Sequence, residues 1–351
     1  YGNDIGFSLF MMQIYNNLPE IYKSVECRHA TFAAVIFQKT RDMKINEIKG
    51  HCAMFTANFM WGLISPVAKY IFAASLISPM LLVEMRVVAA AMLFWITSLF
   101  VKHEHVQHGD MLKLFFASLL GVVFNQGVFT VGVSLTSPID ASVITTSTPI
   151  FTMIIAAIYL KEPITSKKLL GVFIGAIGAL LLISSNGSTS DASHDASIWG
   201  DLLCILAELC FASYFVFFKS LIGRYSPITL MKWMFTYSAV CIIPFTYTDI
   251  EVFNWNSFDT NLVLAVAFTV VCATYLCYLL VPVGQKHLRP TVASMYCYVQ
   301  PIVASGIVAV YWGTSSFNLL KVTAIILVFV GVFLVTTSKS RADMEAAGQQ
   351  V

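Results

Sequence analysis

Glu208 is the residue whose type and position most directly suggest chemistry. It stands in the middle of an apolar segment, where a carboxylate at the centre of a bilayer costs roughly 2.5–3.5 kcal/mol on insertion scales. We therefore expect it to face the protein interior and to be protonated or to meet a cation. Two interpretations stay open: a binding site for a proton or an amine, or a hydrogen-bond acceptor between helices.

Asn58 lies 150 positions before Glu208, in an apolar segment of similar pattern. Each of the two is followed eleven residues later by a lysine, Lys69 or Lys219, and eleven residues are about three helical turns. Asn58 and Lys69 thus share a helix face, with Ser65 between them. Both segments are expected to turn a polar stripe inward, although lysines near helix ends can instead extend to the interface.

Two further segments repeat a polar pattern that is broken by proline. The sequence SPIDASVITTSTPIF (137–151) is followed by RPTVASMYCYVQPIV (289–303), and five identical residues are displaced by 152 positions, Pro149 and Pro301 among them. A proline removes a backbone donor and clashes with the preceding turn, so nearby carbonyl groups need new partners.

Polar groups stand where those partners are needed, with Thr145 and Thr148 in the first segment and Tyr298 and Gln300 in the second. Two broken helices related by a pseudo-twofold axis are expected to line one wet cavity. The alternative is that these prolines and hydroxyls are local kinks and hydrogen bonds between membrane helices.

The remaining candidates are amides, aromatic rings and two charges. Asn125 and Gln126 need partners inside the protein, and several rings fit an amphipathic wall for an organic solute, although each ring alone also fits packing. Glu84 and Arg86 either pair with neighbouring helices or, for Arg86, meet an anionic substrate. The predicted substrate-binding residues are Asn58, Trp61, Ser65, Lys69, Asn125, Gln126, Thr145, Thr148, Glu208, Tyr214, Tyr275, Tyr298 and Gln300, and helix kinks are predicted at Pro149 and Pro301.

The elements that must hold these residues are membrane-spanning helices. Of the 351 residues, 58% are hydrophobic and only 11% are charged. A soluble domain carries about 25% charged residues, so most of this exterior must face lipid. A helix needs about 20 apolar residues to cross a bilayer. The sequence contains ten such segments, at 49–72, 78–101, 111–133, 139–160, 166–184, 199–222, 226–247, 261–284, 290–312 and 317–337.

Positively charged residues are concentrated in every second loop between the predicted spans. The region before the first span, the even-numbered loops and the tail hold most of them, whereas the odd-numbered loops have nearly none and the two long ones are acidic or neutral. By the positive-inside rule, both termini are expected to be cytoplasmic.

Five spans in each half make the second half enter the membrane from the opposite side. This predicts an all-α integral membrane protein of ten transmembrane helices, built as two inverted five-helix repeats around a central cavity. The predicted parts are an N-terminal extension (1–45), repeat one (46–184), a periplasmic linker (185–198), repeat two (199–338) and a cytoplasmic tail (339–351). The extension is interpreted as non-native, upstream of a start at Met43, or as a peripheral helix.

Motifs of other function classes are not found. The eight cysteines contain no CxxC pair, and GVFIGAIG (171–178) lies inside a span without a Walker lysine, so it favours close helix packing over phosphate binding. The histidines of HEHVQH (103–108) fit a solvated loop. The chain is expected to be no enzyme and to bind no metal, cofactor or nucleic acid.

Three stretches carry a family resemblance: WGLISPVAK (61–69), LTSPIDASVITTSTPIFTMIIAAIYLKEPIT (135–165) and GVFIGAIGALLL (171–182). On these residues the chain resembles bacterial EamA-domain members of the drug/metabolite transporter superfamily, over about residues 48–338. A second copy, at 293–313, is weaker, and Thr314 replaces its usual glutamate. The resemblance implies a ten-helix carrier that exports amino acids or other small metabolites by secondary transport, with Lys69 among the cavity candidates.

The expected function is therefore a secondary transporter that moves a small organic metabolite, amino acid-like or related, across the bacterial inner membrane. It is expected to export by alternating access, with Glu208 as a candidate for proton coupling. The expected partners are this metabolite and the lipid bilayer, and the expected state is a monomer or a homodimer. A non-transporting scaffold or sensor and an uncoupled facilitator with the same body stay open.

Overall fold

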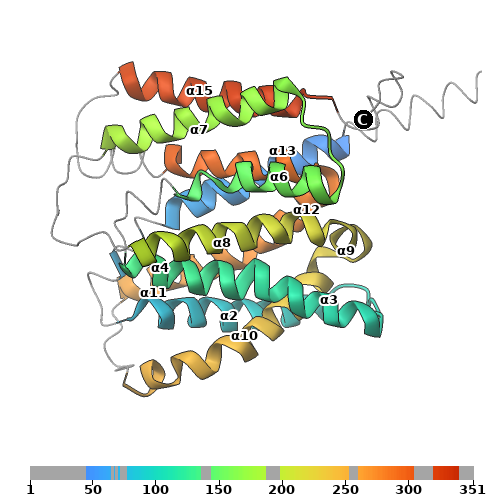
Figure 1. Ribbon diagram of the computed structural model, residues 1–351. Coiled ribbons are helices and arrows are strands. Elements are labelled where there is room, and N and C mark those ends of the chain that lie inside the picture. The colour runs from blue at the N-terminus through green and yellow to red at the C-terminus, as the bar shows by residue number, and fades with distance from the viewer. Residues whose placement is uncertain are drawn as a thin grey trace, which may run out of the picture. The chain divides into compact units, whose positions relative to one another are not determined.

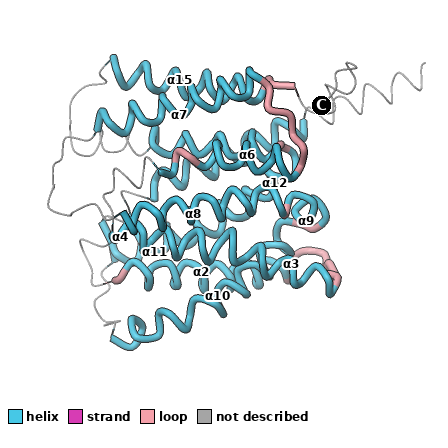
Figure 2. Tube along the Cα trace, in the orientation of Figure 1, coloured by secondary structure: helices cyan, strands magenta, loops and turns pink. Residues whose placement is uncertain are grey.

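The computed structural model describes residues 45–64, 67, 70, 71, 77–135, 144–186, 198–252, 260–303 and 319–339. The chain divides into two compact units, Tyr1–Lys49 and Gly50–Val351, and the second unit holds every contact described below. Among the described residues all regular secondary structure is helical, which confirms the all-α prediction (Figure 2). Ser65 and Lys69 lie outside the described residues, as do nearly all of the predicted extension, linker and tail.

Five described helical stretches are long and apolar enough to cross a membrane, which fits a multi-pass membrane protein. They are Pro79–Ser98, His108–Gly132, Ile198–Phe217, Pro227–Thr246 and Thr260–His287. Two shorter apolar helices, Thr148–Tyr159 and Val322–Thr336, fall within further predicted spans. The number of ten stays a prediction, because the spans predicted at 49–72 and 290–312 are described only in part.

Each half of the sequence supplies one series of helices (Figure 1). The first series is helical residues 50–64, α2 (Pro79–Ser98), α3 (His108–Ser118), η1 (Leu119–Val128), α4 (Phe129–Leu135), α6 (Thr148–Tyr159) and α7 (Ser166–Asn186). The second is α8 (Ile198–Phe217), α9 (Lys219–Arg224), α10 (Pro227–Val252), α11 (Thr260–Val270), η3 (Val271–Leu276), α12 (Cys277–His287), α13 (Pro290–Ser294), η4 (Met295–Tyr298), helical residues 299–303 and α15 (Leu319–Thr336).

The two π-helical segments occupy equivalent positions in the two halves. η1 begins at Leu119 and η3 begins at Val271, 152 positions later, which is the displacement of the repeated proline segments. A π-helix has a wider turn than an α-helix and is often found at functional sites. The same irregularity has therefore been kept at the same place in both halves.

The helices are also interrupted at equivalent places. A turn at Thr146 and Ser147 precedes α6, and the 3₁₀ segment η4 precedes helical residues 299–303. Pro149 is buried in the first turn of α6, where its missing N–H removes no helical hydrogen bond, so it starts a helix rather than bending one. The Ser147 hydroxyl donates to the Ile144 carbonyl at 2.6 Å, and Thr148 Oγ1 lies 2.7 Å from the Thr145 carbonyl oxygen.

Glycines bring α7 and α15 into close contact, and the two helices lie side by side in Figure 1. A Cβ atom at Gly331 would lie 2.6 Å from the carbonyl oxygen of Gly171 and 2.6 Å from the nitrogen of Gly175. The spaced glycines therefore act in helix packing, as the sequence indicates.

Candidate functional site

Two hydrogen bonds, one buried and one partly buried, link the halves, and they are equivalent in the repeat. Thr148 Oγ1 on α6 donates to Glu208 Oε2 on α8 at 2.5 Å, and Gln300 Nε2 donates to Asn58 Oδ1 at 2.9 Å. Glu208 lies 150 positions after Asn58, and Gln300 lies 152 positions after Thr148. Each bond thus joins a residue of one half to a residue of the other, and we call the two bonds the crossed links.

The Glu208 carboxylate is held by hydroxyl groups. Its side chain is 5% exposed, and Thr145 also donates to it. None of the ion pairs between described residues includes Glu208. Asn58 is completely buried, and its Nδ2 donates to the Met54 carbonyl at 2.9 Å, so both its amide atoms have partners.

Gln126 and Tyr278 form a link between equivalent positions. Gln126 Nε2 on η1 donates to the Tyr278 hydroxyl on α12 at 2.8 Å, and the two residues are 152 positions apart. Residues that are equivalent in an inverted repeat can touch only near the pseudo-twofold axis, so this pair marks that axis. Tyr278 was not among the predicted site residues, although its displacement from Gln126 was a usable signal.

An aromatic group surrounds this pair. Trp61 packs edge-on against Tyr278 and Phe211, with ring centroids 5.7 and 6.0 Å away, and its Nε1 donates to the Ala273 carbonyl at 2.9 Å. Phe211 is 150 positions after Trp61, so this ring contact also joins equivalent positions. Tyr214 stacks on Phe211, and its hydroxyl has no hydrogen-bond partner among the described residues.

Three other predicted residues bond to neighbouring helices. Tyr275 shares a hydrogen bond of 2.7 Å with Thr97, Tyr298 donates to the Val172 carbonyl at 3.2 Å, and Asn125 donates to the Ala207 carbonyl at 3.5 Å. Pro301 lies next to Gln300 in helical residues 299–303 and is half-buried. The bonds of Tyr275, Tyr298 and Asn125 also join the two halves. The residues gathered at the interface between the halves are therefore Asn58, Trp61, Asn125, Gln126, Thr145, Thr148, Glu208, Tyr275, Tyr298 and Gln300, with Tyr278 and Phe211 added.

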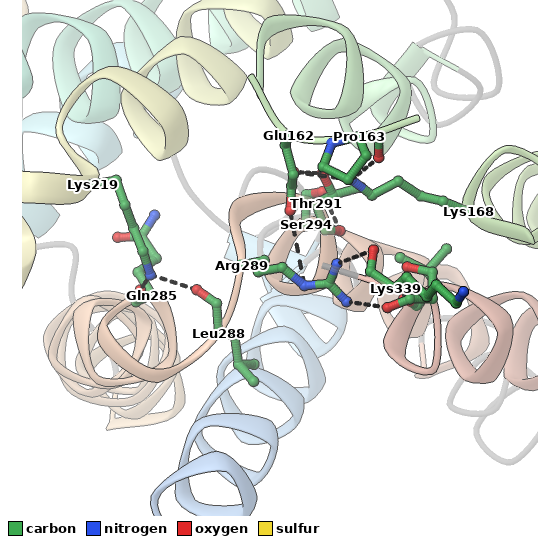
Figure 3. Close-up of polar contacts among 12 residues, drawn as sticks. Glu162, Pro163, Lys168, Lys219, Gln285, Leu288, Arg289, Thr291, Ser294 and Lys339 are labelled. Carbon is green, nitrogen blue, oxygen red and sulfur yellow. Dashed lines mark hydrogen bonds and ion pairs between the residues drawn. The ribbon is translucent and has the colours of Figure 1, made fainter. Parts of the chain in front are cut away.

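Charged side chains tie the halves at one end of the helices (Figure 3). Glu162, after α6, lies 3.1 Å from Lys168 Nζ, accepts a hydrogen bond of 2.8 Å from Thr291, and lies 3.9 Å from Arg289 Nε. Arg289 also donates to the carbonyls of Ser338 and Lys339, at 2.9 and 3.2 Å. We call Glu162, Lys168, Thr291 and Arg289 the Glu162 cluster.

Two other contacts lie at helix ends. Lys219 donates to the carbonyls of Gln285 and Leu288, at the C-terminal end of α12, where the helix dipole favours a cation (Figure 3). Asp110 pairs with Arg224 and accepts from Tyr225 at 2.8 Å. Lys219 is therefore a capping residue for α12, and it begins α9 rather than continuing the α8 helix that carries Glu208.

The structure has two repeated sets of helices, and several of these helices are long and apolar enough to cross a membrane. Polar side chains link the two sets. These features define a class of multi-pass membrane proteins with a polar interface inside. The model of the EamA-like transporter family matches residues 48–184 and again residues 198–337, so the chain belongs to this family. The predicted membership is confirmed, and the chain is a membrane transporter of small solutes rather than an enzyme.

Relatives from three kingdoms are similar to the chain. An "Uncharacterized transporter" of Archaeoglobus fulgidus is 28% identical over 62% of this chain and 74% of its own length. The "Uncharacterized transporter YyaM" of Bacillus subtilis is 27% identical over 61% and 69%. The "WAT1-related protein At5g07050" of Arabidopsis thaliana is 22% identical over 85% and 83%. A solved chain described as "Crystal structure of protein" shares the fold, with a TM-score of 0.66, 14% identity, and coverage of 82% of this chain and 97% of that one.

Proposed function

We propose that the protein is a secondary transporter that exports a small organic metabolite across a bacterial inner membrane by alternating access. The observation that carries this proposal is the pair of crossed links, Glu208 with Thr148 and Asn58 with Gln300. Inverted repeats give two related arrangements of the same contacts, and their substrates bind near the midplane where the repeats meet. The crossed links are hydrogen bonds at that interface, which can exchange as the halves rock.

The two links differ in one respect that suits coupling to protons. Glu208 can gain or lose a proton, whereas its equivalent, Asn58, cannot. A deprotonated Glu208 accepts from Thr148 and Thr145, and proton binding would weaken that hold and free the hydroxyls for the solute. We infer that protonation of Glu208 is exchanged with solute binding.

The surrounding residues favour a small organic solute. Trp61, Phe211 and Tyr278 provide apolar ring surface, while Gln126 and Gln300 provide amide groups beside it. Such a mixture fits an amino acid-like molecule with one apolar and one polar part. We propose no cofactor, a monomer or homodimer, and cytoplasmic termini.

Counterflow in proteoliposomes tests this function. Purified protein is reconstituted, loaded with one member of a panel of amino acids and related metabolites, and tested for uptake of the labelled compound, with and without a proton gradient. We expect uptake above protein-free vesicles, and gradient-dependent accumulation that Glu208→Gln abolishes while counterflow remains.

Glu84→Gln is the matched control, because Glu84 is a second buried carboxylate in a membrane helix, on α2. It should leave the response to the gradient unchanged. Counterflow that ignores the gradient in the wild-type protein would indicate a facilitator. No flux for any member of the panel would favour a scaffold or sensor and contradict the proposal.

A further inference from the structure

Arg86 on α2 is a cation inside a membrane helix, and the part of the chain that the structure describes offers it no acidic partner. Its Nε donates to Thr274 Oγ1 on η3 at 2.8 Å, and the Thr274 hydroxyl in turn donates to the Thr269 carbonyl at 2.8 Å. Among the described residues no carboxylate lies within ion-pair distance of Arg86. Arginine has five N–H donors, and the described residues accept from only this one.

Glu84 does not serve as the counter-ion, although it lies two residues away. Residues at positions i and i+2 of a helix do not face each other. Glu84 is buried among other neighbours, and its Oε2 has no hydrogen-bond partner among the described residues. The two charges therefore stand on different faces of α2.

The guanidinium of Arg86 lies beside the interface between the halves. Its hydrogen bond to Thr274 joins α2 of the first half to η3 of the second, and Thr274 stands four residues before Tyr278 in the chain. Tyr278 in turn holds Gln126 Nε2, while Gln126 Oε1 is buried without a donor among the described residues. Arg86 and Gln126 thus bond to residues four positions apart on the continuous helix of η3 and α12, and each has polar atoms without a partner among the described residues.

We propose that Arg86 binds a carboxylate group of the transported solute, and that Thr274 holds its guanidinium in position for this contact. The inference rests on the proposed transport function and names its substrate class. A guanidinium matches a carboxylate through two parallel N–H···O bonds, and an unpaired charge inside a membrane is costly unless such a partner arrives. Gln126 Oε1 is then the acceptor for a donor group on the same solute.

The charge balance favours a monoanionic group over a phosphate ester. One guanidinium neutralises one carboxylate, whereas a dianion would leave a buried negative charge without compensation. The second half adds no further cation here, because the position equivalent to Arg86, 148 residues later, is the buried Met234. The cation of the proposed site therefore comes from the first half, while Thr274, which positions it, comes from the second.

Pairs of solutes that differ only in a carboxylate and a carboxamide test this inference. Thermal unfolding in detergent and counterflow in proteoliposomes are measured for each pair with wild type, Arg86→Gln and Arg86→Lys. We expect wild type to prefer the acid about tenfold or more, Arg86→Gln to lose the preference, and Arg86→Lys to retain part of it. Arg224→Gln, which removes an arginine at a helix end, is the matched control and should keep the preference.

The outcomes separate this inference from the proposed function. If wild type transports no solute, yet acids stabilise it and Arg86→Gln removes that effect, transport is contradicted and the carboxylate site stands. If Arg86→Gln transports with an unchanged preference for acids, or wild type treats acid and amide alike, the site is contradicted. The wild-type comparison of acid and amide remains a test even if Arg86→Gln does not fold. Thr274→Val is a second test, because it keeps the charge of Arg86 but removes the hydroxyl that accepts its hydrogen bond, and it should weaken acid binding.

Discussion

The two halves of the molecule share their backbone irregularities but differ in the side chains at equivalent positions. Both halves have a π-helical segment and an interruption before a proline at matching places. At the interface, however, Asn58 in the first half corresponds to Glu208 in the second, and Gln126 corresponds to Tyr278. Rocking between two related arrangements needs a common backbone, whereas recognition of one solute does not need symmetric chemistry.

Two charged residues that bond across the halves are not repeated at the equivalent positions. The first half supplies Arg86, where the second has Met234, and the second supplies Glu208, where the first has Asn58. A solute with an anionic and a cationic end would meet both groups in only one orientation. Under the proposed function, the side chains rather than the fold would then set the direction in which a solute lies.

The largest expected effect concerns the Glu162 cluster, which joins the halves through a glutamate that only the first repeat has, since Thr314 takes its place in the second. Glu162→Ala leaves Lys168, whose side chain is 1% exposed, without its carboxylate. Removing one partner of a buried pair costs about 3–5 kcal/mol. We expect a fall of that order in the free energy of unfolding, measured by thermal unfolding in detergent.

Arg224→Ala is the control for this change. Arg224 pairs with Asp110, but its side chain is 48% exposed, so the loss should stay within about 1 kcal/mol. Equal losses for the two variants would show that the Glu162 cluster is no stronger than a surface ion pair.

The next effect concerns Gly62, which corresponds to Ala212 in the second half. A Cβ atom at Gly62 would lie 2.7 Å from Val303 Cβ and 2.8 Å from the Gln300 carbonyl oxygen, so Gly62→Ala forces the halves apart beside a crossed link. We expect a loss of about 1–3 kcal/mol and reduced counterflow. Gly127→Ala, which meets nothing within 4 Å, should change neither, and a Gly62→Ala protein of unchanged stability would contradict the close approach.

Much of this comparison could be predicted from the sequence. The displacement of about 150 residues gave the correspondence of Asn58 with Glu208 and of Thr148 with Gln300, because proline, serine and glycine survive where the backbone requires them. Which equivalent residues bond across the halves could not be predicted, because displacement carries no distance. Tyr278 was missed for this reason, since a tyrosine in an apolar run fits packing until its contact with Gln126 is known.

The third effect sharpens the comparison of the crossed links. A double-mutant cycle with Glu208→Gln and Thr148→Val measures the link that contains a carboxylate, and one with Asn58→Leu and Gln300→Leu measures the neutral link. Hydrogen bonds to charged groups contribute about 1.5–3 kcal/mol and neutral ones about 0.5–1.5 kcal/mol. We therefore expect the larger coupling energy for Glu208 and Thr148 when Glu208 is ionised, by thermal unfolding of each set of variants. Equal coupling energies at every pH would mean that Glu208 is protonated throughout and does not exchange its proton.

The smallest effect concerns Glu104, in the loop before α3, which ties the first half to the start of α10. Burial acts to raise the pKa of Glu104. Several contacts outweigh this effect: a hydrogen bond of 2.9 Å from the Ser226 N–H, the hydroxyls of Ser226 and Thr229, and the charge of Lys286. The pKa of Glu104 therefore lies below its ordinary value. A lowered pKa in the folded protein means that Glu104 adds stability above the ordinary glutamate pKa and loses it as the pH falls through the folded value. We expect Glu104→Gln to lower the free energy of unfolding by under about 1 kcal/mol at pH 7, and the difference from wild type to shrink in acid. A difference that stays constant down to pH 3 would mean that the contact is held by shape rather than by the carboxylate charge.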